Sequence, residues 1–415
     1  MLLKKLENLR SIHLNIEEFN YYELFIGLFF ITSSFFINPF YLLFLGALIE
    51  KKLTLPTYIN YVIAFSIAFS ISNREIGSYW VSLGGNLGED DALNYLSFYH
   101  DFKVNSYVLR PDKYFRNLLE GKEPLWFIFA ETIGNLFFFN DKILVFLSVS
   151  IPVFILHRTF IEISPFFCFN SLIFYILIPE SFHTLYHLWR FSLSSSILYY
   201  GFIKLIKHQK IPLKYLLLAL SAHISAILLI FSFYLGDTTL RNKTISSVYT
   251  RIYIIFLLLI KIIIIGILLF SLLKYLEFDK LFFYLGNDVV VKFNYNFRHL
   301  IYICISLFFL IFNKNKYIIT IALLNIFLLI LPFLLPEIGL VMERILILTT
   351  PFLPLIIAFH YRSSLNELIF LILPMFFLFI YYSFKLSNQL FYQFISNGNF
   401  FSFYNGILYN IIYHQ

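Results

Sequence analysis

Long, continuous apolar runs recur along almost the whole chain, separated by short polar or basic stretches. Most runs approach the roughly 20 residues that a helix needs to cross a bilayer. Their apolar positions are unbroken rather than alternating, which favours helices over strands. Residues 21–37 and 40–49 form either a tight helical hairpin or one helix kinked at Asn38–Pro39. The other expected membrane helices cover residues 57–72, 143–156, 166–178, 190–206, 252–273, 299–312, 317–335, 344–360 and 365–383.

Two segments interrupt this pattern. Residues 73–122 form a polar stretch far longer than an ordinary connection, and loops of this length are usually functional or disordered. Its many aromatic residues argue against disorder. Residues 124–139 are apolar but short, and Glu131, Thr132 and Asn135 interrupt them. We predict a re-entrant or interfacial helix that begins at Pro124, so that residues 73–139 form an external loop containing this helix.

The basic residues between the apolar runs predict the orientation. Lys204, Lys207 and Lys210 form a cluster that marks a cytoplasmic end, which places residues 179–190 on the external side. Residues 212–235 are either one helix or a hairpin of two short helices that turns near His223, and the hairpin fits the charges slightly better. The prediction is an all-α, polytopic membrane protein of about 11 to 13 spans, in a single domain that covers residues 1–415.

Composition supports a membrane protein. The chain is 60% hydrophobic and only 13% charged, whereas soluble domains are about one quarter charged. Its net charge of +7 resides in lysines and arginines between apolar runs, where they set topology and meet lipid headgroups, so we expect no nucleic-acid partner. Cys168 and Cys304 lie far apart, without ligand spacing, and predict neither a disulfide nor a metal site.

Ionisable residues at the external ends of spans are the candidates for chemistry, because charge near the bilayer is costly. Arg190 lies between Trp189 and Phe191 at the mouth of a span, and its planar guanidinium suits phosphate oxygens. The alternative is an interfacial arginine beside an aromatic belt. Glu343 and Arg344 open a later span, where an external arginine runs against the positive-inside rule.

Other candidates have plain structural explanations. His223 in an apolar run is more often a packing residue than a base. Asp90 and Asp91 resemble a metal-binding acidic pair but suit the start of a helix equally well. His183 and His187 have HxxxH spacing without a zincin glutamate, so we expect no metal. The chain has neither a P-loop nor a dinucleotide fingerprint, and we expect no cofactor.

Several segments, in order, resemble the EpsG-like branch of the Wzy-type polysaccharide polymerases. The resemblance spans roughly residues 20–380. Phe191 replaces a usual glutamine, Ser194–Ser196 replace alanine-rich positions, and residues 78–87 are an insertion. The matching segments are SNREIG (72–77), EDDALNYLSFY (89–99), GKEPLWFIF (121–129), LWRFSLSSSILYYGF (188–202), ALSAHISAILL (219–229) and the pair Glu343–Arg344.

The resemblance implies a GT-C-like membrane glycosyltransferase in the bacterial inner membrane that polymerises undecaprenyl-pyrophosphate-linked repeat units of O-antigen, capsule or exopolysaccharide. It implies an active site on the periplasmic or external face, no metal, and a chain-length regulator as an expected partner beside membrane lipids. Such chemistry needs arginines for the pyrophosphate, a general base and aromatic platforms for sugars. The candidates are Arg190, Arg344, Arg74 and Arg116 for pyrophosphate, Glu123, Asp91 and His223 for the base, and Trp80, Tyr95, Tyr99 and Trp126 for glycan.

Other functions remain open at this point. An O-antigen ligase or another lipid-linked glycosyltransferase would also gather external arginines. A repeat-unit flippase belongs to a different class, and such transporters often show inverted repeats and charge at mid-membrane, which the sequence does not show clearly. A membrane O-acetyltransferase would rely on a histidine–carboxylate pair and an acyl donor, and nothing here resembles that pattern closely.

Overall fold

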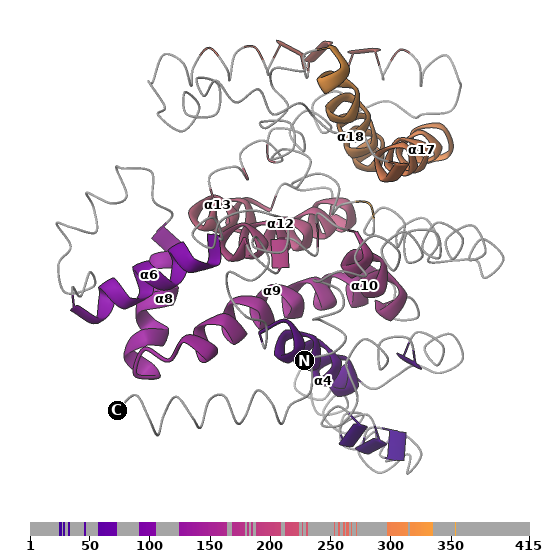
Figure 1. Cartoon of the computed structure of the whole chain (residues 1–415). Helices are drawn as coiled ribbons and strands as arrows, with labels where there is room; N and C mark the ends of the chain where they lie inside the picture. Colours follow the sequence, from indigo (N-terminus) through magenta and orange to yellow (C-terminus); the bar gives the residue numbers. More distant parts are fainter. Residues whose placement is uncertain are drawn as a thin grey trace, which may run out of the picture.

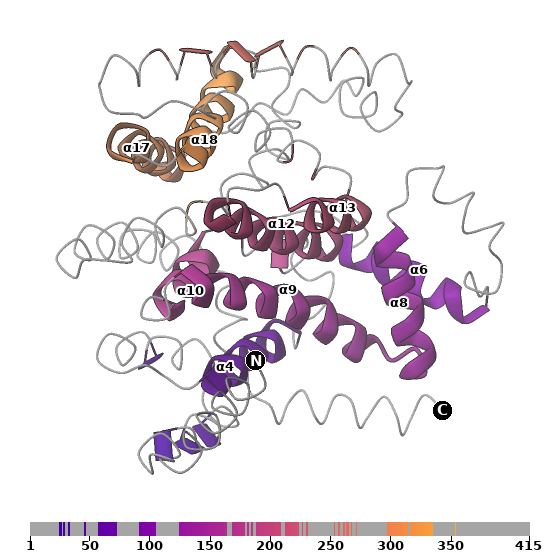
Figure 2. The same ribbon diagram turned by 180° about the vertical axis from the view of Figure 1, so that it is seen from behind.

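The computed structural model describes residues 57–72, 91–104, 124–163, 168–178, 188–208, 212–223, 297–313 and 316–334, together with single helical positions between them. Every element in this part of the chain is a helix (Figures 1 and 2). The helices are α4 (Thr57–Ser72), α6 (Asp91–Val104), α8 (Pro124–Leu136), α9 (Asp141–Ile163), α10 (Cys168–Leu177), α12 (Trp189–His208), α13 (Leu213–Ala222), α17 (Phe297–Phe312) and α18 (Lys316–Leu334).

Most predicted boundaries lie within a few residues of these helices. The predicted span 57–72 coincides with α4, and α8 begins at Pro124 as expected. The prediction for 143–156 was too short, since α9 continues through His157 and Arg158 to Ile163. Predicted spans 344–360 and 365–383 fall outside the described residues, apart from the helical position Leu353.

The ambiguous segment 212–235 breaks where the hairpin interpretation places its turn. Helix α13 ends at Ala222, and His223 is extended, with φ −160° and ψ 129°. Its backbone N–H still donates to the carbonyl of Ala219, which closes the last turn. An uninterrupted helix is therefore wrong at this point, while the course of the chain beyond it lies outside the described residues, apart from Ala226 and Ile230.

Aromatic contacts fix the direction of α4 against α9. The rings of Tyr61 and Phe154 stack with centroids 4.6 Å apart, and those of Phe69 and Phe146 stack at 4.4 Å. Residue numbers rise along α4 as they fall along α9, so the two helices are antiparallel. Within the part of the chain that the structure describes, α9 is the one helix long and apolar enough to cross a membrane.

Helices α9 and α12 pack side by side and run in the same direction (Figure 1). Their first residues both lie near α6, because Tyr95 of α6 contacts Trp189 and His100 of α6 contacts Asp141. Their last turns also meet, through Glu162 and Lys204. The described helices around α12 therefore have two different ends, one with the contacts of α6 and one with the ion pair of Glu162 and Lys204. A helical rise of 1.5 Å per residue puts Arg190 and Lys204 about 21 Å apart along α12.

Helix α13 returns antiparallel to α12. Tyr200 contacts Tyr215 near one end of the pair, and Phe191 contacts His223 at the other. Farther along the chain, α17 and α18 pack on each other (Figure 2). The single-domain organisation, the count of about 11 to 13 spans and the GT-C-like arrangement remain predictions.

Candidate functional site

Arg190 occupies the second position of α12, and its guanidinium lies over an aromatic ring. Its Cζ is 5.0 Å from the centroid of the Tyr95 ring on α6. This distance is within the range of a cation–π interaction, in which the ring face attracts the cation. A cation–π contact uses the charge of the guanidinium and none of its N–H donors, so it orients Arg190 without occupying those donors itself.

Three large rings from three helices meet beside Arg190. Tyr95 lies 5.4 Å from Trp126 of α8 and 5.4 Å from Trp189 of α12, and the two tryptophans are 6.2 Å apart. We call Tyr95, Trp126 and Trp189 the aromatic cluster. All three are buried, and tilted contacts at these separations stabilise the pairs beyond their buried area.

The indole N–H groups of Trp126 and Trp189 are buried and make no hydrogen bond. A buried tryptophan N–H usually finds an acceptor, and leaving one without a partner costs about 1–3 kcal/mol. Two such donors lie in the aromatic cluster beside Arg190. The cluster therefore holds donors that an oxygen-rich substrate could satisfy if the rings separated.

The sequence of α6 explains how Tyr95 reaches this position. Ala92, Tyr95, Tyr99 and Phe102 recur at helical spacing and are all buried, so they form the inward stripe of α6. The Tyr99 hydroxyl donates to the backbone carbonyl of Asn140 at 3.5 Å. Burial, followed by the nearby Asp141 carboxylate, raises the pKa of Tyr99, which keeps its hydroxyl a neutral donor.

Small residues let α13 approach α12 and carry His223 to the site. Ser194 donates a hydrogen bond of 2.7 Å to the carbonyl of Ala219 on α13. A Cβ on Gly201 would lie 3.1 Å from the Cβ of Tyr215, so the helices are nearly in backbone contact there. The His223 ring then packs edge-on against Phe191, with centroids 5.3 Å apart.

The structure thus brings four of the predicted site residues to one end of the described bundle: Arg190, Tyr95, Trp126 and, through its contact with Phe191, His223. Tyr99 lies one turn farther along α6, and Asp91 opens that helix. The side chains of Glu123, Arg344, Arg74, Arg116 and Trp80 lie outside the described residues. The assigned chemical roles remain predictions.

Three of the residues predicted to stack on sugars are buried in the structure. The exposed fractions of Tyr95, Tyr99 and Trp126 are 5%, 0% and 2%. A sugar ring stacks on an open aromatic face, so these residues could serve as platforms only after the rings that cover them move away. In the observed arrangement, Tyr95 supports Arg190.

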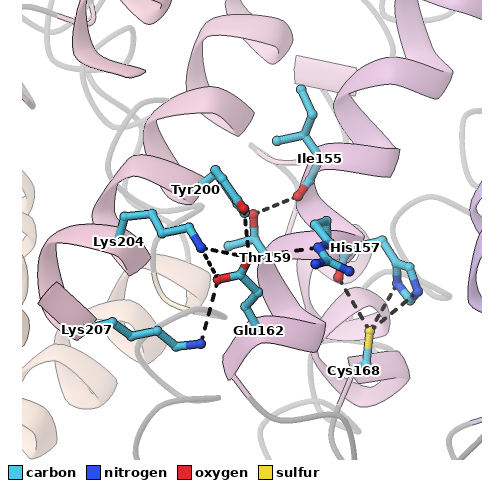
Figure 3. A network of polar contacts seen from close by, with 9 residues as sticks. Ile155, His157, Thr159, Glu162, Cys168, Tyr200, Lys204 and Lys207 are labelled. Carbon is cyan, nitrogen blue, oxygen red and sulfur yellow. Dashed lines mark hydrogen bonds and ion pairs between the residues drawn. The ribbon is translucent and has the colours of Figure 1, made fainter. Parts of the chain in front are cut away.

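The structure brings several residues into clusters for which the sequence predicted no role. Trp189 appeared only as a neighbour of Arg190, although it belongs to the aromatic cluster. Glu131 appeared only as an interruption in 124–139, yet it is 2% exposed, and a buried carboxylate in such a helix is a candidate for function. Glu162 went unnoticed, although Tyr200, Lys204 and Lys207 converge on it (Figure 3). Its position four residues after Arg158 was the available signal.

Metal ligation has no structural candidate in the described segments, where no three His, Cys, Asp or Glu side chains gather. Cys168 is a free, buried thiol whose Sγ lies 3.0 Å from Nδ1 of the buried His157. The pair contributes two potential ligands, fewer than the three or four that zinc sites use. His183 and His187 lie outside the described residues.

Comparison with known proteins identifies the family. No curated protein and no solved structure matches the chain. The model of the EpsG family, however, matches residues 76–397, which include α6 through α18 and hence Arg190, the aromatic cluster and His223. The match covers well over half of the chain and agrees with the resemblance seen in its motifs. The chain therefore belongs to the EpsG family of membrane proteins.

Proposed function

We propose that this protein polymerises undecaprenyl-pyrophosphate-linked oligosaccharide repeat units on the external face of the bacterial inner membrane. The observation that carries the proposal is the guanidinium of Arg190, held over Tyr95 beside the aromatic cluster at one end of the described bundle. An oriented arginine at a membrane surface suits a lipid pyrophosphate. EpsG-family membership supports a role in polysaccharide polymerisation.

The orientation follows from the two ends of α12. Lys204 and Lys207 occupy its last turns, and a basic cluster at a helix end is typical of the cytoplasmic side. Arg190 lies about 21 Å away along the helix axis, at the opposite end. In a multi-pass protein with this orientation, Arg190 and His223 face the exterior, where lipid-linked glycans are displayed.

The reaction joins an acceptor hydroxyl to the anomeric carbon of the donor. The acceptor oxygen forms the new glycosidic bond while the bond from the anomeric carbon to the pyrophosphate oxygen breaks. The departing lipid pyrophosphate takes the bonding electrons, and Arg190, with Arg344, Arg74 and Arg116, stabilises the negative charge that develops on it. The hydroxyl proton passes to a base, for which Glu123, Asp91 and His223 are candidates in that order. The proposed chemistry uses neither a metal nor a nucleotide sugar.

Substitution of Arg190 tests this assignment. We expect Arg190→Ala to abolish polymerisation in a complemented deletion strain, so that single repeat units accumulate on the lipid. Arg190→Lys should restore little activity, because a lysine lacks the planar fork that binds two phosphate oxygens. The readout is glycan chain length on a gel, at matched amounts of membrane-inserted protein.

Lys103→Ala is the matched control, since it removes one exposed cation from α6 without touching the aromatic cluster. It should polymerise normally. Full-length glycan from the Arg190→Ala variant would refute the assignment. A deletion strain that still makes polymer but does not attach it to its final acceptor would instead identify a ligase.

A further inference from the structure

One carboxylate and three cations form a second charged cluster at the other end of α9 and α12. Glu162 lies in the last turn of α9, and its side chain is 12% exposed. Lys204 Nζ donates to both carboxylate oxygens, at 2.7 and 3.0 Å, and the Tyr200 hydroxyl donates to one of them at 2.7 Å (Figure 3). These bonds satisfy much of the accepting capacity of Glu162.

The other two cations, Arg158 and Lys207, lie near Glu162 but make no hydrogen bond to it. Arg158 Nε is 3.8 Å from one oxygen of Glu162, and Lys207 Nζ is 3.7 Å from the other. Both distances exceed that of a hydrogen bond. Their side chains are 47% and 37% exposed. The guanidinium and the ammonium therefore keep donors for a ligand outside the cluster, and one carboxylate among three cations leaves a net charge of +2.

The geometry points to a binding site for the phosphate of an anionic phospholipid headgroup, formed by Arg158 and Lys207 at the cytoplasmic end of α9 and α12. Lipid is the expected source because α9, which carries Arg158 and Glu162, is long and apolar enough to cross a membrane. Basic clusters beside membrane helices attract anionic lipids of the cytoplasmic leaflet. This inference rests on the orientation proposed above, and the polymerase chemistry plays no part in it.

The stability of the helix ends explains why Lys204 and Tyr200 contact Glu162, but it does not explain why Arg158 and Lys207 lie there as well. A carboxylate in the last turn of a helix opposes the helix dipole, so Glu162 needs a compensating cation. Lys204 and Tyr200 already supply that compensation through hydrogen bonds. Exposed ion pairs such as those of Arg158 and Lys207 contribute little to stability. Their convergence is explained better by an anion outside the protein.

Lipid binding to the full-length protein in detergent tests the site. Native mass spectrometry would count bound phosphatidylglycerol or cardiolipin for the wild type, Arg158→Gln, Lys207→Gln and the double variant. We expect each single substitution to weaken anionic-lipid binding about fivefold and the double variant about 25-fold, since each cation near an anionic surface is worth about 1 kcal/mol. Phosphatidylcholine should bind weakly to all four proteins.

Lys103→Gln is the matched control, because it removes one exposed cation from α6 at the other end of the described bundle. It should leave lipid binding unchanged. Equal loss in Lys103→Gln and Lys207→Gln would overturn the site, since binding would then depend on net charge alone. Displacement of the lipid by millimolar inorganic phosphate would overturn the choice of lipid. A loss of polymerisation in Arg190→Ala with normal lipid binding separates this inference from the proposed function.

Discussion

The guanidinium carbon of Arg190 lies 5.0 Å from the centroid of the Tyr95 ring, although the two residues belong to helices far apart in the sequence. The ring itself contacts both Trp126 and Trp189. Arg190 therefore points along a direction that α6, α8 and α12 determine together. A positioned cation can stabilise charge that develops during a reaction without having to reorganise first.

We expect Tyr95 to act as a positioning residue. Tyr95→Leu removes the ring face under Arg190 and should slow polymerisation roughly two- to thirtyfold, as expected for a cation–π interaction of about 0.5–2 kcal/mol. Tyr95→Phe keeps the ring and should retain most activity. Polymerisation rate at equal amounts of folded protein is the measurement.

Phe102→Leu serves as the control for this prediction. It removes a buried ring from the same face of α6, but its contact is with Phe127, away from Arg190. It should lower thermal stability, while the polymerisation rate at equal amounts of folded protein should stay near that of the wild type. Equal rate losses in Phe102→Leu and Tyr95→Leu would show that Tyr95 acts only through packing.

The three candidate bases predict different pH–rate profiles. Loss of a general base costs about 10²–10⁴ in rate, and activity rises with pH as the base loses its proton. We expect Glu123→Gln to cause the largest loss, Asp91→Asn a smaller one and His223→Gln the smallest. A carboxylate base places the rising limb near pH 4 and an imidazole base near pH 6.5, before the site shifts either value. A rising limb near pH 6.5 that disappears in His223→Gln would reverse this order.

The sequence predicted most helix boundaries in the described segments because apolar runs end at proline or charge. It failed at the end of α9 for a reason that lies in another helix. His157 and Arg158 suggested a helix end, but His157 is buried against Cys168 of α10, and Glu162 is paired by Lys204 of α12. These contacts let the helix continue through polar positions, and their partners Cys168 and Lys204 lie outside residues 143–163, so the pattern of that segment does not identify them.

For the candidate site too, the sequence predicted single residues but not the contacts between helices that bring them together. Arg190 was a candidate because it lies at the mouth of a span, and Tyr95 and Trp126 were candidates because the family resemblance implies aromatic platforms for sugars. Their convergence depends on how α6 crosses the first turns of α9 and α12, which Tyr99 and Asn140 help to fix. Spacing along one chain carries no information about such a crossing. Trp189 went unassigned for this reason.

Gly201 should be essential for the close packing of α12 and α13. Gly201→Ala places a Cβ 3.1 Å from Tyr215, which a shift of a few tenths of an ångström relieves, whereas Gly201→Leu forces the helices apart. We expect Gly201→Leu to lower the free energy of unfolding by about 1–3 kcal/mol, as overpacking does. It should also slow polymerisation, because α13 positions His223 against Phe191. Thermal unfolding in detergent and the polymerisation rate are the measurements.

Ser194→Ala gives the comparison for Gly201→Leu. It removes the hydrogen bond to Ala219 and should cost about 1 kcal/mol without moving α13. Its polymerisation rate should therefore stay near that of the wild type. Wild-type stability in Gly201→Leu would contradict the close approach of the two helices.

Glu162 and Lys204 should stabilise the protein as a coupled pair. Lys204→Met leaves a mostly buried carboxylate without its main partner and should lower the free energy of unfolding by about 1–3 kcal/mol. Glu162→Gln should cost less, because the amide oxygen can still accept from Tyr200 and Lys204. In the double variant Glu162→Gln/Lys204→Met, the charge that needed a partner is gone, so its loss should be smaller than the sum of the two single losses. Thermal unfolding of the four proteins completes this double-mutant cycle. Additive losses would mean that solvent already screens the pair, and the contact between the last turns of α9 and α12 would then depend on their apolar packing alone.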